Sequence, residues 1–322
     1  MKKKSKQRDQ LPEQLSNSSN ENYHVPVLLN ETIDGLSIKP AGTYVDCTFG
    51  GGGHSKAILE HLGPMGKLFA FDQDEDAKRN LPTDERLVFI PHNFRHIARF
   101  LRLHQVTLVD GIMADLGVSS HQFNEANRGF STRFDALLDM RMDQRQTRTA
   151  YDIVSTLSEP QLHKMFEQYG EVTNAKTLAK AIVELRNHTS LKTIDAFKNA
   201  LRGVVKGNPK KYFAQVFQAL RIEVNDELGA LKEMLQQIPK LLKPGGRAAI
   251  ITFHSLEDRL VKVFFKRGSF DEPVDNPFIN TDMVNELKIV TRKPIQPSEK
   301  ELKENPRSRS ARLRVAEKIM MI

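Results

Sequence analysis

Residues 43–55 have the sequence Thr43-Tyr44-Val45-Asp46-Cys47-Thr48-Phe49-Gly50-Gly51-Gly52-Gly53-His54-Ser55. The first three residues are typical of a short β-strand, and residues 55–61 predict a helix. Glycine adopts positive φ and lets a ligand approach the backbone closely, and a helix start offers unpaired N–H groups. The stretch therefore predicts a strand–turn–helix unit that binds a ligand. The structural alternative is that the glycines only shape a tight turn.

Composition places the chain among soluble globular proteins. It has 322 residues, of which 39% are hydrophobic and 27% charged, enough for one large domain or two smaller ones. No run of 18 apolar residues occurs, and no apolar signal core follows the basic start, so we expect neither a membrane span nor secretion. Cys47 is the only cysteine, which excludes an intrachain disulfide and a cysteine-rich zinc site. These features predict a cytoplasmic protein.

The chain is basic. Its net charge of +8 and isoelectric point near 9.4 favour a polyanionic partner, with nucleic acid the first candidate. The alternative is a basic soluble protein without such a partner. Residues 1–22 are polar and predict a disordered basic tail.

Downstream of the glycine turn, short apolar runs alternate with helical stretches. The predicted strands cover residues 43–45, 67–72, 87–90, 111–115, 247–253, 287–291 and 311–316. Helices are predicted between them, including residues 76–79 and 95–104. This alternation predicts an α/β fold with a mostly parallel sheet covered on both faces.

The alternation stops between the fourth and fifth strands. Residues 121–150 are loop-like, and residues 158–206 carry apolar positions at helical spacing, with Thr193 as a helix cap. We interpret residues 125–210 as a helical insertion. A long helix over residues 212–242 then leads to the fifth strand, and Ser255 and Asp258 have the spacing of a capping box for the next helix.

The residues near the turn discriminate between ligands. A dinucleotide fold would place a third glycine where Ser55 stands, and no Gly-Lys-Ser/Thr sequence completes a phosphate-binding loop. Asp72 ends the second strand, 22 residues beyond Gly50, where a carboxylate can accept hydrogen bonds from a ribose. With Phe94 after the third strand, the pattern favours an adenosine ligand without pyrophosphate, and S-adenosylmethionine is the first candidate. An NAD-dependent oxidoreductase is the weaker alternative.

Eight ordered motifs between residues 23 and 318 resemble the ribosomal methyltransferase H family, bacterial small-subunit ribosomal RNA (cytosine-N4)-methyltransferases. They lie at residues 24–29, 46–54, 115–120, 128–131, 139–143, 217–222, 253–259 and 305–310. One departure is Ala136-Leu137, which replaces a Gly-Pro pair and leaves the shape of the following loop open.

The resemblance implies a class I, Rossmann-like methyltransferase fold with a seven-stranded sheet, formed by residues 23–124 and 211–322, and a substrate-recognition insertion at 125–210. It also implies S-adenosylmethionine as methyl donor and a cytidine of 16S ribosomal RNA near the decoding centre as acceptor, within the small ribosomal subunit. By motif position, the implied donor contacts are Gly52, Gly53, His54, Asp72, Phe94, Asp115 and Gln122. Whether the chain forms a homodimer is left open.

Acceptor chemistry suggests further residues. The cytosine amine is a poor nucleophile, so a site must align it and accept its hydrogen bonds. Asp115 and Ser119, at the end of the fourth strand, are candidates, as is His254 after the fifth strand. Helix capping is the structural alternative for Ser119, and no metal is predicted.

Arginines and lysines beside the insertion and near the C-terminus form the candidate RNA contacts. They are Arg128, Arg133, Arg141, Arg145, Arg148, Lys206, Lys210, Lys211, Arg307, Arg309, Arg312 and Arg314. A solvated basic face is the alternative, and a non-catalytic RNA-binding assembly factor is the competing function.

Overall fold

A single mixed sheet organises the computed structural model, which describes residues 26–271 and 285–320. Within these residues seven strands lie in the order β3-β2-β1-β4-β5-β7-β6. The strands are β1 (Thr43–Asp46), β2 (Lys67–Phe71), β3 (Leu87–Ile90), β4 (Val109–Asp115), β5 (Leu242–Thr252), β6 (Leu287–Ile289) and β7 (Arg312–Lys318). Strands β1 to β5 are parallel, and β7 is antiparallel to β5 and β6. The predicted α/β fold is confirmed, and the predicted tail at residues 1–22 lies outside the described residues.

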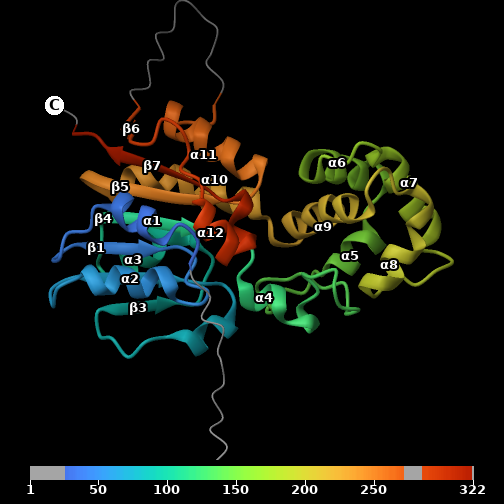
Figure 1. Cartoon of the computed structure of the whole chain (residues 1–322), viewed down its shortest axis with the longest axis horizontal. Helices are drawn as coiled ribbons and strands as arrows, with labels where there is room; N and C mark the ends of the chain where they lie inside the picture. Colours follow the sequence, from blue (N-terminus) through green and yellow to red (C-terminus); the bar gives the residue numbers. More distant parts are fainter. Residues whose placement is uncertain (1–25, 272–284, 321–322) are drawn as a thin grey trace, which may run out of the picture.

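Helices cover both faces of this sheet (Figure 1). Those around it are α1 (Leu29–Leu36), α2 (Gly53–His61), α3 (Ile97–Leu103), α10 (Glu227–Leu241), α11 (Ser255–Arg267) and α12 (Glu299–Glu304), with the 3₁₀ turns η1 (Glu75–Asn80), η2 (Phe94–His96) and η5 (Pro306–Ser310). Consecutive strand residues point to opposite faces. Tyr44 packs in the core with α1 and α2, whereas Val45 packs with α3, α10 and α11.

Beside the sheet, a helical part of the chain has a hydrophobic core of its own, which extends from Phe130 to Val224 (Figure 1). Its elements are α4 (Ser120–Asn124), η3 (Ala126–Arg128), α5 (Ala150–Thr156), α6 (Glu159–Gly170), α7 (Ala175–Leu185), α8 (Ile194–Ala200), η4 (Arg202–Val204) and α9 (Pro209–Asn225). Thr193 caps α8 as predicted, because its side chain accepts from the Ala196 N–H. The boundaries predicted at residues 125 and 210 stay a prediction.

Three local predictions were wrong. The helix expected over residues 212–242 is two helices, since Asp226 adopts the left-handed conformation (φ 47°) between α9 and α10. Residues 76–79 lie in a 3₁₀ turn, η1. The N-cap of α11 is His254 and not Ser255, because the His254 side chain accepts from the Glu257 N–H.

Among residues 26–271 and 285–320, no helix has the length and apolar character needed to cross a membrane.

Candidate active site

The glycine turn and the end of β2 are joined through one carboxylate. Oδ2 of Asp72 accepts from the Gly50 N–H at 2.7 Å, and Oδ1 accepts from the Asp74 N–H at 2.8 Å. Burial raises the pKa of Asp72 to about 6, although the two hydrogen bonds act in the opposite direction and lower it. Each oxygen keeps a second lone pair, so the carboxylate is held in place and can still accept from two hydroxyl groups.

The four glycines have different surroundings. Gly50 and Gly52 have φ of 50° and 77°, a conformation that favours glycine. A Cβ on Gly53 would lie 2.1 Å from Cγ of Pro26, so this glycine permits close packing of the N-terminal segment. A Cβ on Gly51 would meet nothing within 4 Å. The turn thus presents open backbone at Gly51, which fits the approach of a ligand.

His54, in the first turn of α2, is buried and neutral. Its Nε2 lies 3.0 Å from the Val27 carbonyl, and because a carbonyl only accepts, Nε2 carries the hydrogen. Burial lowers the pKa of His54 to about 4. The Nδ1 lone pair is therefore available, and it lies 3.8 Å from Oδ2 of Asp115.

Asp115 ends β4 beside the turn. Its backbone N–H donates to Oγ1 of Thr48 at 2.7 Å. Its Oδ1 is covered and has no hydrogen-bond partner among the described residues, while a quarter of the side chain is exposed. Burial, followed by the charges of Asp46, Glu257 and Glu301, raises the pKa of Asp115 well above its usual value. A carboxyl group with an unused oxygen and a raised pKa can accept a hydrogen bond or a proton from a ligand.

Ser119 and Gln122 form a capping box at α4. Oγ of Ser119 accepts from the Gln122 N–H at 3.1 Å, and Oε1 of Gln122 accepts from the Ser119 N–H at 3.0 Å. The Gln122 Nε2 also donates to Oδ2 of Asp74 at 2.8 Å. A Cβ on Gly50 would lie 3.7 Å from Cβ of Ser119, so the capping box borders the glycine turn.

The structure therefore gathers most of the predicted site residues at adjoining strand ends. Phe94 begins η2 at the exit of β3 and packs, partly buried, against the core on the α3 and α10 face. Its predicted contact with an adenine stays a prediction, as do the other predicted site roles.

His254 follows β5 and belongs to a buried polar group. Its Nε2 lies 3.2 Å from Oε1 of Glu257 without making a hydrogen bond, and Oε2 of Glu257 accepts from the Phe253 N–H at 2.9 Å. The ligand atoms of Glu227, His254 and Glu257 lie within 4.8 Å of one another. Arg221, however, donates to both oxygens of Glu227 at 2.7 and 2.9 Å. The Arg221 guanidinium therefore already compensates the carboxylate charge of Glu227.

The arginines at the entry to the helical part have internal partners. Arg128 is buried, forms an ion pair with Asp74, and donates to Asp76 and the carbonyls of Arg141 and Met142. The other ion pairs are Arg141 with Asp139, Arg145 with Asp143 and Arg148 with Glu223. These contacts stabilise the loop, and Arg128 is not exposed for RNA as the sequence had suggested.

Two carboxylates that support the site were not predicted from the sequence. Asp46 is fully buried and accepts from Oγ of Ser55 at 2.7 Å, which fixes α2 against β1. Glu301, in α12, accepts from the Leu28 N–H at 2.8 Å. The Asp46 and Ser55 pair lies within the glycine stretch and could have been predicted there. Leu28 and Glu301 are 273 positions apart in the sequence, and no pattern links them.

Known proteins match nearly the whole chain. The family model described as the MraW methylase family matches residues 21–319. A curated protein of Flavobacterium johnsoniae is 55% identical over 298 residues, which cover 92% of this chain and 98% of that protein. One of Azobacteroides pseudotrichonymphae is 54% identical with the same coverage, and one of Bacteroides thetaiotaomicron is 52% identical over 297 residues, 92% of this chain and 97% of that protein. All three are named ribosomal RNA small subunit methyltransferase H.

Proposed function

The chain belongs to the MraW methylase family, and we propose that it methylates the exocyclic N4 of a cytidine in small-subunit ribosomal RNA, with S-adenosylmethionine as donor. The names of the three relatives support the RNA substrate. The observation that carries the chemistry is the unpartnered Oδ1 of Asp115 beside the glycine turn.

The residues at the turn fit an adenosyl donor. Gly52, Gly53 and His54 provide the backbone next to the open position at Gly51. Asp72 is oriented by two backbone N–H groups and accepts from the ribose hydroxyls. Phe94 and Gln122 complete the donor contacts. When bound, the donor supplies an electrophilic methyl group together with its own leaving group.

Asp115 acts on the acceptor amine. The lone pair of cytosine N4 is delocalised into the ring, so the amine needs an acceptor that returns electron density to nitrogen. Oδ1 of Asp115 accepts a hydrogen bond from the amine, and the carboxylate then takes the proton that the methylated nitrogen loses. Nδ1 of the neutral His54 lies 3.8 Å from Oδ2 of Asp115 and accepts from the carboxyl group when Oδ2 carries the proton. General-base action of this kind is worth about 10²–10⁴ in rate.

Ser119 and His254 are the weaker acceptor candidates. The Ser119 hydroxyl already accepts from Gln122, although it keeps one lone pair and its hydrogen. His254 is engaged with α11 and Glu257. The proposed substrate is the small ribosomal subunit, which places the reaction in the cytoplasm.

Transfer of a labelled methyl group tests the proposal. Purified small subunits lacking this modification are incubated with the protein and methyl-labelled S-adenosylmethionine, and the RNA is digested and analysed by mass spectrometry. We expect the label on N4-methylcytidine. Donor binding without transfer would instead favour a non-catalytic assembly factor, and label at another atom would contradict the proposed acceptor.

A further inference from the structure

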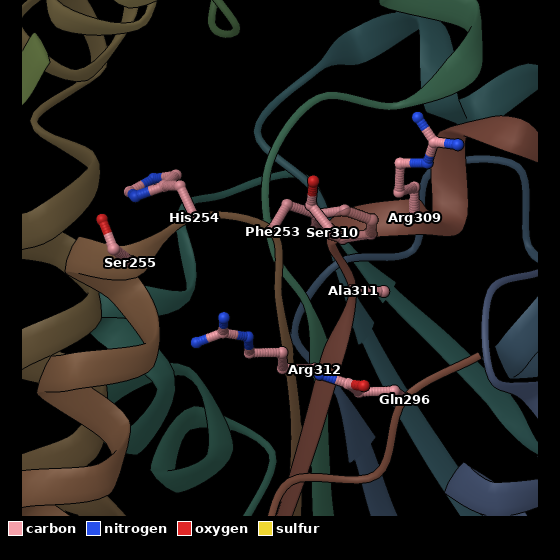
Figure 2. A pocket seen from close by; sticks show the side chains of 8 residues that line it. All are labelled: Phe253, His254, Ser255, Gln296, Arg309, Ser310, Ala311 and Arg312. Atoms are coloured by element: carbon pink, nitrogen blue, oxygen red, sulfur yellow. The ribbon is translucent and has the colours of Figure 1, made fainter.

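A polar pocket of about 360 Å³ lies where β5 ends and β7 begins. Figure 2 shows the side chains around it, which come from the segment between β5 and α11, the start of α11, the segment before α12, η5 and the start of β7. They are Phe253, His254, Ser255, Gln296, Arg309, Ser310, Ala311 and Arg312. The volume is within the range of small-ligand sites, about 300–1,000 Å³.

The pocket is next to the end of β4. Asp115 is paired with Ile251 in the parallel β4–β5 register, and Phe253 follows two residues later. A Cβ on Gly117 would lie 3.6 Å from Cδ2 of Phe253. Phe253 thus separates the pocket from the segment that leaves Asp115, and a ligand here lies beside the proposed acceptor position.

The charge of the pocket is positive. Among the described residues, the exposed Arg309 has no hydrogen-bond or ion-pair partner, and no carboxylate lines the pocket. Nη1 of Arg312 donates to Oδ2 of Asp258 at 3.0 Å, but Arg314 donates to both oxygens of the same carboxylate at 2.7 and 3.1 Å. Asp258 therefore compensates one of these two guanidiniums. The carboxylate at the rim is Glu171, 3.5 Å from Oγ of Ser255.

Arg309 differs from the other arginines near the site in how its N–H donors are used. Arg128, Arg141 and Arg145 each donate to a nearby carboxylate and to backbone carbonyls. Arg307 stacks over the Phe123 ring at 4.9 Å and donates to Asn124 at 2.6 Å. Their donors are used within the protein, whereas those of Arg309 remain available for a ligand.

We propose that this pocket binds a phosphodiester of the RNA strand that carries the target nucleotide. The proposal rests on the proposed function for the identity of the RNA. The planar guanidinium of Arg309 matches two phosphate oxygens in a bidentate contact, and Ser310 and Gln296 add neutral donors. The contact holds the RNA strand on the far side of Phe253 from the segment that follows Asp115, so that the neighbouring nucleotide is presented to the donor.

Steady-state kinetics of Arg309→Ala with small subunits test this role. The loss of one charge-assisted contact should raise KM for the subunits about tenfold and leave kcat within twofold. The slope of log KM against log salt should become shallower by about 0.7–0.9, the contribution of one phosphate. Arg309→Lys retains the positive charge but cannot make the bidentate contact of the guanidinium, and it should recover part of the affinity.

Arg102→Ala is the matched control. Arg102 is an exposed arginine near the C-terminal end of α3, just before the chain enters β4 at its amino end, whereas the proposed site lies at the carboxyl end of β4. It should behave like the wild type. Binding of S-adenosylhomocysteine, measured by calorimetry, should be the same in all four proteins. An unchanged KM and salt slope in Arg309→Ala would overturn the phosphate site, and so would a loss of donor affinity, which would assign Arg309 to the donor. If the wild type itself transfers no methyl group to RNA, the proposed function fails instead.

Discussion

At the residue scale, Asp115 combines a covered, unpartnered oxygen with a partly exposed side chain. Replacement by asparagine keeps the shape but removes the proton acceptor. We expect Asp115→Asn to lower kcat by about 10²–10⁴, while affinity for S-adenosylhomocysteine changes by a few fold. Because burial raises the pKa of Asp115, the wild-type rate should increase with pH as the carboxyl group ionises. The variant should lack this increase, and a wild-type pH profile in Asp115→Asn would exclude the role.

His54 makes a separate prediction about stability. Its pKa falls from 6.5 to about 4 in the folded state, so the unfolded chain binds more protons between these pH values. The unfolding free energy should therefore decrease as pH falls from 6.5 to 4, by about 3 kcal/mol from this group. In His54→Gln, whose amide can still donate to Val27, this decrease should be smaller. Urea unfolding at several pH values measures it.

His61→Gln is the control for that measurement, because His61 is an exposed histidine in the same helix. Its pH dependence should match the wild type. Equal slopes in all three proteins would mean that His54 does not titrate with a lowered pKa.

The sequence predicted the positions of individual residues at strand ends better than it predicted their partners. Asp72 and Asp115 could be predicted because both follow apolar strands, whose carboxyl ends meet at one edge of a parallel sheet. The burial of Arg128 could not be predicted, since it depends on the ion pair with Asp74, 54 residues earlier, and on the Met142 carbonyl in the following loop. The capping role of His254 could not be predicted either, because imidazole is a rare cap.

At the scale of elements, the glycine turn predicts different effects for neighbouring substitutions. Gly51→Ala places its Cβ in open space, so the melting temperature should stay close to that of the wild type while donor affinity falls. Gly53→Ala places its Cβ 2.1 Å from Pro26 and should lower the melting temperature by several degrees. Differential scanning calorimetry and titration with S-adenosylhomocysteine separate the two effects. Full donor affinity in Gly51→Ala would show that the turn does not contact the donor.

The α9–α10 break shows what periodicity alone cannot reveal. The apolar positions of α9 and α10 continue at helical spacing, and neither glycine nor proline stands between the helices. Asn225 and Asp226 are residue types that tolerate the left-handed conformation, which was the available signal. Tertiary contacts select the break. Arg95 donates to Asp226 at 2.6 Å, and Nδ2 of Asn225 donates to the Met140 carbonyl at 2.8 Å.

At the scale of the whole molecule, the helical part and the sheet are joined by buried polar contacts. Arg128 links Asp74 and Asp76, after β2, to the carbonyls of Arg141 and Met142. Because Asp74 also accepts from Gln122, this network connects the capping box at the site with the loop that enters the helical core. The Arg128 guanidinium is therefore the buried polar link between the helical part and the glycine turn, and Arg145, which donates to the Pro91 carbonyl at 3.0 Å, adds an exposed one.

Removal of the Arg128 guanidinium should destabilise the molecule more than removal of an exposed one. The Arg128 side chain is 8% exposed, and Arg128→Ala would leave the buried Asp74 without its ion-pair partner, at a cost of about 3–5 kcal/mol. Asp76 would keep its ion pair with Arg79. Arg128→Lys keeps the charge but cannot reach both acidic residues and both carbonyls, so an intermediate loss is expected. Arg148→Ala is the control, since Arg148 is 46% exposed and its ion pair with Glu223 spans 3.5 Å, so it should lose less than about 1 kcal/mol. Urea unfolding gives these values, and limited proteolysis of the loop at residues 129–149 should be faster in Arg128→Ala. If Arg128→Ala were as stable and as resistant as Arg148→Ala, the Arg128 guanidinium would not be needed to position the helical part.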